Sequence, residues 1–187
     1  MTPGTAGRAV VLIGPMGAGK TSIGRKAARE LRVPFFDTDV AVTRAHGPIP
    51  EIFAQQGEAR FRELERAAVR EGLQTGGIVA LGGGAILDAD TRADLRRHPV
   101  VLLTVDARTV AGRLHATTRP LLQGDDALSR WRAVAAERGP VYDDLADVTF
   151  DTSTGHIKDI VTRVTDWVRA QWAARDAAAT ASESEAP

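Results

Sequence analysis

The sequence of 187 residues contains no cysteine, which excludes disulfides and thiolate-bound metals and suits a reducing compartment, the cytoplasm. Net charge is absent as well, because 24 Lys and Arg balance 24 Asp and Glu, so nothing attracts the chain as a whole to nucleic acid or to a membrane surface. No apolar run reaches the roughly 18 residues of a membrane-spanning helix. Any anion that the protein binds must therefore be held by a local group of residues.

The most informative segment is a glycine-rich loop that directly follows an apolar stretch. Residues 14–21, Gly-Pro-Met-Gly-Ala-Gly-Lys-Thr, match the pattern G-x-x-x-x-G-K-[ST] of phosphate-binding loops. Glycines let backbone N–H groups approach phosphate oxygens, the lysine supplies a positive charge, and the threonine hydroxyl suits Mg²⁺. The loop predicts a nucleoside triphosphate site whose contacts are Gly17, Ala18, Gly19, Lys20, Thr21 and Ser22.

Short apolar runs alternate with longer segments of helical periodicity, which indicates an α/β fold. Strands are expected at residues 10–13, 33–36, 78–81, 100–105 and 148–151. Helices are expected at residues 20–31, 39–45, 49–55, 58–73, 88–96, 108–115, 126–138 and 157–174, with Asp88 and Asp106 as N-caps. Five such strands predict a mostly parallel sheet with helices on both faces and every ligand group at its carboxyl edge.

One domain is expected over residues 8–172, between a flexible N-terminus (1–7) and a disordered tail (173–187) that is rich in Ala, Ser, Thr and acidic residues. The polar segment at about 112–125 lies between two predicted helices. We expect it to form a mobile lid that excludes water and carries Arg119 over the phosphates.

Two carboxylates leave the second predicted strand at its ligand-facing end, in Phe36-Asp37-Thr38-Asp39. One of them could help to hold Mg²⁺ through water, and the other could accept a substrate hydroxyl. Asp39 could instead be only the N-cap of the helix that follows. The residues alone leave open which of the two carboxylates acts as a base.

Three further groups could hold a small anionic substrate. Arg62 and Glu65 are three positions apart on a predicted helix, where Glu65 could fix the guanidinium for a bidentate grip on a carboxylate; a charged face of this kind is also often only solvated. Gly82 to Gly84 follow a strand, and three glycines favour close approach of a ligand over a simple turn. Arg138 precedes Gly-Pro at a predicted helix end and could bind the anion or merely cap helix carbonyls.

Together these residues resemble the shikimate kinases, in that family's order and at close to its spacing, from residue 10 to about residue 172. The shared signatures are the phosphate loop, residues 36–39, Phe61-Arg62-Glu63-Leu64-Glu65, Gly82-Gly83-Gly84-Ala85, Arg119-Pro120-Leu121-Leu122 and Arg138-Gly139-Pro140-Val141-Tyr142. The resemblance implies a three-layer P-loop NTPase fold with a five-stranded parallel sheet. It also implies transfer of the γ-phosphoryl group of ATP to the 3-hydroxyl of shikimate.

The resemblance assigns roles to individual residues. Lys20, Asp39 and Arg119 would be catalytic, and Arg113 and Arg119 would join the loop in binding ATP. Shikimate would contact Asp39, Arg62, Glu65, Gly82, Gly83, Gly84 and Arg138, and Mg²⁺ would contact Thr21 and Asp37. We expect a cytoplasmic monomer that binds ATP and shikimate but no nucleic acid or membrane. The alternatives are a related small-molecule kinase such as a gluconokinase, or a non-catalytic nucleotide-binding module.

Overall fold

The computed structural model describes residues 8–114 and 127–184, and its centre is a sheet of five parallel strands in the order β2-β3-β1-β4-β5. The strands are β1 (Ala9–Ile13), β2 (Phe35–Asp37), β3 (Gly77–Ala80), β4 (Val100–Thr104) and β5 (Val148–Asp151). All five predicted strands are confirmed, with shifts of one or two residues at their ends. The parallel order puts all their carboxyl ends at one edge of the sheet.

Helices connect the strands. They are α1 (Lys20–Leu31), α2 (Thr38–His46), α3 (Ile49–Thr75), α4 (Ala89–Leu95), α5 (Ala107–Leu114), α6 (Ala127–Leu145) and α7 (Ile157–Ser184), with a short 3₁₀ helix, η1 (Ala85–Leu87). Helix α3 is broken at Gly57, where φ is 81°, so the two helices expected there are both present. The predicted N-caps are confirmed, because Asp88 accepts a hydrogen bond from the Thr91 N–H at 2.7 Å and Asp106 accepts one from the Thr109 N–H at 2.6 Å.

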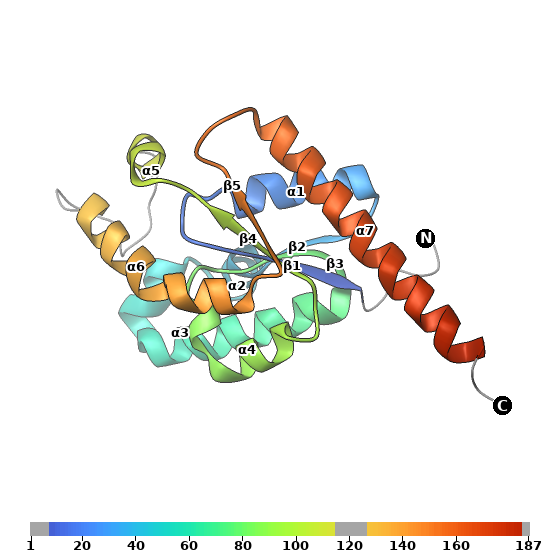
Figure 1. Ribbon diagram of the computed structural model, residues 1–187. Coiled ribbons are helices and arrows are strands. Elements are labelled where there is room, and N and C mark those ends of the chain that lie inside the picture. Colours follow the sequence, from blue (N-terminus) through green and yellow to red (C-terminus); the bar gives the residue numbers. More distant parts are fainter. Residues whose placement is uncertain (1–7, 115–126, 185–187) are drawn as a thin grey trace.

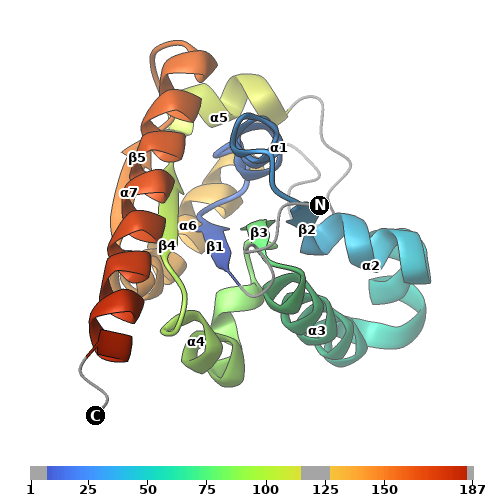
Figure 2. The ribbon, with the colours of Figure 1, turned by 90° about the vertical axis from the view of Figure 1, so that its right-hand side faces the viewer.

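The central strands β1 and β3 are buried on both faces of the sheet, because none of their residues is polar. Helices α1, α5 and α7 lie over one face and α3 and α4 lie over the other (Figures 1 and 2). Strand β1 shows how the sequence does this, since all five of its residues are buried. Val10 and Leu12 join the core under α1 and α7, whereas Val11 and Ile13 join the core under α3 and α4.

Helix α6 differs from the prediction, which ended it at Arg138 before Gly-Pro. The helix instead continues through Pro140 to Leu145. An internal proline removes one helix hydrogen bond and costs about 3 kcal/mol. Tyr142 and Leu145 lie beyond the proline and are both buried in the core under α3 and α4, and each burial contributes about 2 kcal/mol in compensation. Tertiary packing therefore outweighs the local signal to stop.

The first half of α6 contributes Trp131 to the opposite core, which also contains Ala18 and Ile23. Its second half contributes Tyr142 to the core under α3 and α4. This helix therefore passes across the carboxyl edge of the sheet, from one face to the other.

Helix α7 also runs further than expected, because it continues to Ser184 and includes most of the segment predicted to be disordered. Alanine, the strongest helix former, is the commonest residue in this stretch. An ion pair with two hydrogen bonds between Arg8 and Asp176 connects the helix to the chain just before β1. No helix in the described ranges is long and apolar enough to cross a membrane.

Candidate active site

The loop between β1 and α1 has the backbone of a phosphate-binding loop. Its glycines have φ values that side chains disfavour: 134° at Gly14, 84° at Gly17 and 85° at Gly19. The Lys20 ammonium donates to the carbonyl oxygens of Gly14 at 2.6 Å and Pro15 at 3.0 Å. The lysine charge is therefore held over the start of the loop, next to the backbone groups that would meet a phosphate.

A pocket of about 430 Å³, here called the loop pocket, opens beside this loop. All six residues of the loop that were expected to contact the nucleotide line it, from Gly17 to Ser22. Thr152, Gly155, Ile157 and Ile160 also line it, and the Thr152 hydroxyl donates to the Ala18 carbonyl of the loop at 3.0 Å. The volume lies in the range of small-molecule sites, and the lining combines the phosphate loop with the apolar side chains of Ile157 and Ile160, which suits a nucleotide.

Thr21 and Asp37 meet at the edge of the loop pocket. The Thr21 hydroxyl donates to Asp37 Oδ2 at 2.6 Å, and Asp37 Oδ1 accepts from the Val40 N–H at 3.1 Å. Asp37 is thus the N-cap of α2, so the alternative that assigned this cap to Asp39 is wrong. Hydroxyl and carboxylate oxygens suit Mg²⁺, and no cluster of three acidic or imidazole ligands occurs in the described ranges. This donor set fits a Mg²⁺ ion whose other ligands are phosphates and water.

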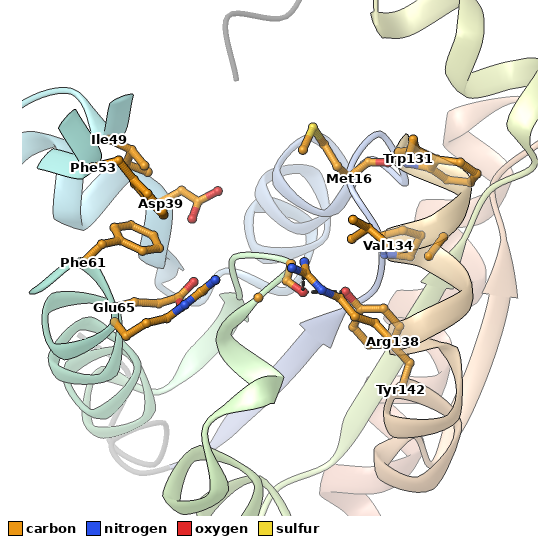
Figure 3. A pocket seen from close by; sticks show the side chains of 15 residues that line it. Met16, Asp39, Ile49, Phe53, Phe61, Glu65, Trp131, Val134, Arg138 and Tyr142 are labelled. Atoms are coloured by element: carbon orange, nitrogen blue, oxygen red, sulfur yellow. Dashed lines mark hydrogen bonds and ion pairs between the residues drawn. The ribbon is translucent and has the colours of Figure 1, made fainter. Parts of the chain in front are cut away.

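A second pocket of about 140 Å³, here called the α6 pocket, adjoins the first and shares Met16 and Asp39 with it. Figure 3 shows its two walls facing one another. Apolar side chains of α3 form one wall and one face of α6 forms the other: Ile49, Phe53 and Phe61 against Trp131, Val134, Ala135, Arg138 and Tyr142. Four charged residues also line the pocket: Asp39, Arg62, Glu65 and Arg138.

Glu65 holds Arg62 in place. Its side chain is 5 % exposed, and Arg62 Nη1 donates to its Oε2 at 2.7 Å, while Arg62 Nη2 donates to Glu58 Oε1 at 2.9 Å. Burial raises the pKa of Glu65, although the charge of Arg62 opposes that rise. Burial also disfavours the charge on Arg62, but the Glu65 and Glu58 carboxylates more than offset it and raise the pKa of Arg62. The guanidinium is therefore charged and fixed from one side.

Close approach explains two of the three glycines after β3, Gly82 and Gly84. Neither has a positive φ, so what the site requires there is the lack of a side chain. A Cβ on Gly82 would lie 2.5 Å from Asp39 Oδ1 and 2.7 Å from Glu65 Oε1, and a Cβ on Gly84 would collide with Arg62 Nη1. The bare backbone thus lets Asp39, Arg62 and Glu65 converge on one spot.

Gly83 links this loop to α6. Its carbonyl oxygen accepts from Arg138 Nη1 at 3.0 Å and from the Tyr142 hydroxyl at 2.6 Å (dashed in Figure 3). Burial raises the pKa of Tyr142 to about 12, although the charge of Arg138 opposes the rise, so the hydroxyl remains a donor. Arg138 lies inside α6, and the alternative that made it a cap of helix carbonyls is wrong.

The described site residues are gathered around the two pockets, but two predicted arginines are not tested. Arg119, with nearly all of the predicted lid, lies outside the described residues, as does the side chain of Arg113. No site role was predicted for Trp131 or Tyr142 on α6. Their spacing from Arg138, seven and four residues along one helix, is a signal that could have found them.

Comparison with known proteins agrees with this geometry. The sequence model of the shikimate kinase family matches residues 16–169. A shikimate kinase of Thermobifida fusca is 48% identical over 146 residues, which are 76% of this chain and 84% of that protein. The structure of a shikimate kinase from Acinetobacter baumannii in complex with shikimate aligns with a TM-score of 0.82 at 34% identity, covering 88% of this chain and 94% of that one.

A gluconokinase from Sinorhizobium meliloti aligns less closely, with a TM-score of 0.58 at 20% identity, over 90% of this chain and 95% of that one. At this level of identity the likeness shows the fold alone. The sequence identity thus favours the shikimate kinases over the gluconokinases, which the motifs alone had left as an alternative.

Proposed function

The chain belongs to the shikimate kinase family, and we propose that its two adjoining pockets hold ATP and shikimate for direct phosphoryl transfer. The enzyme transfers the γ-phosphoryl group of ATP to the 3-hydroxyl of shikimate and so gives shikimate 3-phosphate and ADP, a step in aromatic amino acid biosynthesis. The observation that carries the proposal is that Asp39 lines both pockets. A hydroxyl bound at Asp39 in the α6 pocket would face phosphates bound in the loop pocket.

Two arginines would hold the shikimate carboxylate in the α6 pocket. Arg62 is supported by Glu65 on one wall, and Arg138 lies on the opposite wall. Arg138 Nε is buried without an acceptor among the described residues, and a buried donor of this kind favours binding an anion. Guanidinium groups bind carboxylates with two hydrogen bonds, which fixes the orientation of the acid as well as its position. The carboxylate end would thereby set where the ring hydroxyls lie.

In the loop pocket, we assign the triphosphate to the backbone N–H groups of Gly17 to Ser22 and to the Lys20 ammonium. Thr21 and Asp37 would hold Mg²⁺ through their oxygen atoms. When bound, that ion neutralises phosphate charge that develops during transfer. Roles for Arg113 and Arg119 at the phosphates and near adenine stay predictions from the sequence.

Asp39 is the candidate base. We propose that its carboxylate orients the 3-hydroxyl of shikimate and accepts the hydroxyl proton as the oxygen attacks the γ-phosphorus. The new bond joins that oxygen to phosphorus, and the bond from phosphorus to the oxygen that bridges the β- and γ-phosphates breaks and leaves ADP. Catalysis then depends on in-line positioning and on Lys20 stabilising the transferred group.

The test measures ADP release from MgATP with shikimate, with gluconate or with no acceptor. We expect shikimate, but not gluconate, to raise the rate of ADP release above the rate without acceptor. A rate with shikimate no higher than the rate without acceptor would refute the assignment. Asp39→Asn should abolish most turnover, whereas Asp90→Asn, an exposed carboxylate in the first turn of α4, should not. Chelating Mg²⁺ with EDTA should stop the reaction, and excess Mg²⁺ should restore it.

A monomeric state and a cytoplasmic location also stay predictions. Sedimentation velocity tests the first, and fractionation of the producing cells tests the second.

A further inference from the structure

Trp131 joins the two pockets through one hydrogen bond. Its indole Nε1 donates to the carbonyl oxygen of Met16 in the phosphate loop at 2.9 Å. Trp131 is 7% exposed and lines the α6 pocket, while Met16 lines both pockets. Figure 3 shows the two residues next to each other at the rim of the pocket.

The bond acts on a peptide unit that also carries a candidate phosphate ligand. The Met16 carbonyl and the Gly17 N–H belong to the same planar peptide and point in opposite directions. Gly17 lines the loop pocket and has a φ of 84°. A donor that fixes the carbonyl from the α6 side therefore also fixes the direction of the Gly17 N–H, and backbone N–H groups are what such loops use to bind phosphate.

The same helix reaches the other substrate. Trp131 and Arg138 are seven residues apart on the face of α6 that lines the α6 pocket, and Arg138 and Tyr142 both donate to the Gly83 carbonyl. Helix α6 thus contacts the phosphate loop at one point and the glycine loop at another. The helix, held at both points, provides a contiguous route by which a shift of either loop would reach the other.

We propose that Trp131 is a positioning residue that orients the Met16–Gly17 peptide for the phosphates of the nucleotide and couples their binding to that of the acceptor. The inference rests on the proposed function, because it takes the loop pocket as the ATP site and the α6 pocket as the shikimate site. Trp131 itself contacts neither reacting atom in this scheme. Its effect is exerted through the loop backbone.

The test compares Trp131→Phe with Trp172→Phe. Phenylalanine keeps an aromatic ring but lacks the N–H donor. Trp172 Nε1 is buried with no acceptor among the described residues, and Trp172 packs against the core as a partly buried residue of α7. The control therefore removes an indole without removing a hydrogen bond to the loop.

Affinity for MgADP is measured by titration calorimetry without acceptor, so the result does not depend on which acceptor the enzyme uses. We expect Trp131→Phe to weaken MgADP roughly three- to ten-fold, the range for one hydrogen bond, and Trp172→Phe to stay within about two-fold of wild type. The stoichiometry of each titration gives the folded fraction, so misfolded protein does not distort the affinity.

Two further readouts separate positioning from packing. In Trp131→Phe the KM for MgATP should rise by the same factor as the MgADP affinity falls. The affinity for shikimate without nucleotide should stay within about two-fold of wild type. Any increase in shikimate affinity that MgADP produces in wild type should be smaller in the variant. An MgADP affinity equal to that of wild type would overturn the inference. So would an equal decrease in the affinities for MgADP and for shikimate together with a lower Tm, because that result would indicate a packing defect. Absence of shikimate turnover in wild type would instead count against the proposed function.

Discussion

Replacing Gly82 by alanine adds a single methyl group at the point where the glycine loop meets α2 and α3. The added Cβ would lie 2.5 Å from Asp39 Oδ1 and 2.7 Å from Glu65 Oε1. Ordinary contact begins at 3.4 Å, so the oxygens would have to move by about 0.9 Å and about 0.7 Å, or the loop would have to retreat by a similar distance. Asp39 lies on α2 and Glu65 lies on α3, so the methyl group would shift the proposed base relative to the glycine loop of the acceptor pocket.

Displacement of a reacting group by about 1 Å can reduce a rate about 100-fold. We therefore expect kcat/KM for shikimate to fall about 100-fold in Gly82→Ala, which corresponds to about 2.7 kcal/mol of transition-state stabilisation. Gly82 does not have a positive φ, so the backbone accepts alanine. The overpacking should cost only about 1–3 kcal/mol of unfolding free energy.

Steady-state rates with shikimate varied at saturating MgATP, together with thermal unfolding, measure both quantities. Gly139→Ala is the matched control, because its Cβ would meet nothing within 4 Å and it lies inside α6, where alanine is favoured over glycine by about 1 kcal/mol. The control should keep its activity and gain stability. If Gly82→Ala kept kcat/KM within about three-fold of wild type, the close contact with Asp39 and Glu65 would not govern the site.

Arg62→Ala should raise the KM for shikimate about ten-fold or more, the value of a charged hydrogen bond, and should change the KM for MgATP less than three-fold. Arg60→Ala, which breaks an exposed ion pair, is its control. Equal effects on the KM values of both substrates would place Arg62 elsewhere. Because burial raises the pKa of Glu65, its carboxyl takes up a proton at a higher pH than an ordinary glutamate and then loses its hold on Arg62. The KM for shikimate should therefore rise on acidification with a midpoint above 4.5, and Glu65→Gln should flatten this pH profile; an unchanged profile in that variant would assign the titration to another group. Tyr142→Phe removes the donor to the Gly83 carbonyl and should lower the unfolding free energy by about 1 kcal/mol in urea titrations, equally at pH 6 and pH 9 because the tyrosine pKa of about 12 keeps the hydroxyl protonated; a loss confined to one pH would contradict the assignment.

Local signals were sufficient for the nucleotide side of the molecule. The phosphate loop, the apolar strand before it and the helix from Lys20 to Leu31 are specified within one short segment, and the structure has them as predicted. Asp88 and Asp106 were also predictable as caps, because a cap depends on the three residues that follow it. Where the contacts that determine a structure are close in sequence, the sequence is sufficient to predict that structure.

The acceptor side depends on contacts between distant segments, and there the predictions were less complete. Gly-Pro at positions 139 and 140 read as the end of a helix, whereas burial of Tyr142 and Leu145 keeps α6 intact. With the helix ended too early, Trp131 and Tyr142 did not appear as parts of one face. A proline penalty is visible locally, but the burial that outweighs it becomes visible only once the fold is known.

The glycine loop lies between these cases. Three successive glycines predicted the close approach of a ligand, and that contact stays a prediction. The structure adds that the groups nearest to a Cβ built on Gly82 are the protein's own carboxylates, Asp39 and Glu65. Sequence indicated that space was needed there, and only the arrangement of α2, α3 and the glycine loop identified what fills it.

The pair between Arg8 and Asp176 brings residues near the two ends of the described chain together, next to the amino end of β1. Both substrates are assigned to the far end of that strand, so this corner is separated from them by the full length of the sheet. An immobilised or fused form of the enzyme attached at this corner would keep both pocket mouths toward the solution. The same proximity means that a short engineered connection between these two positions would turn the molecule into a closed ring, with new chain ends open to choice elsewhere on its surface.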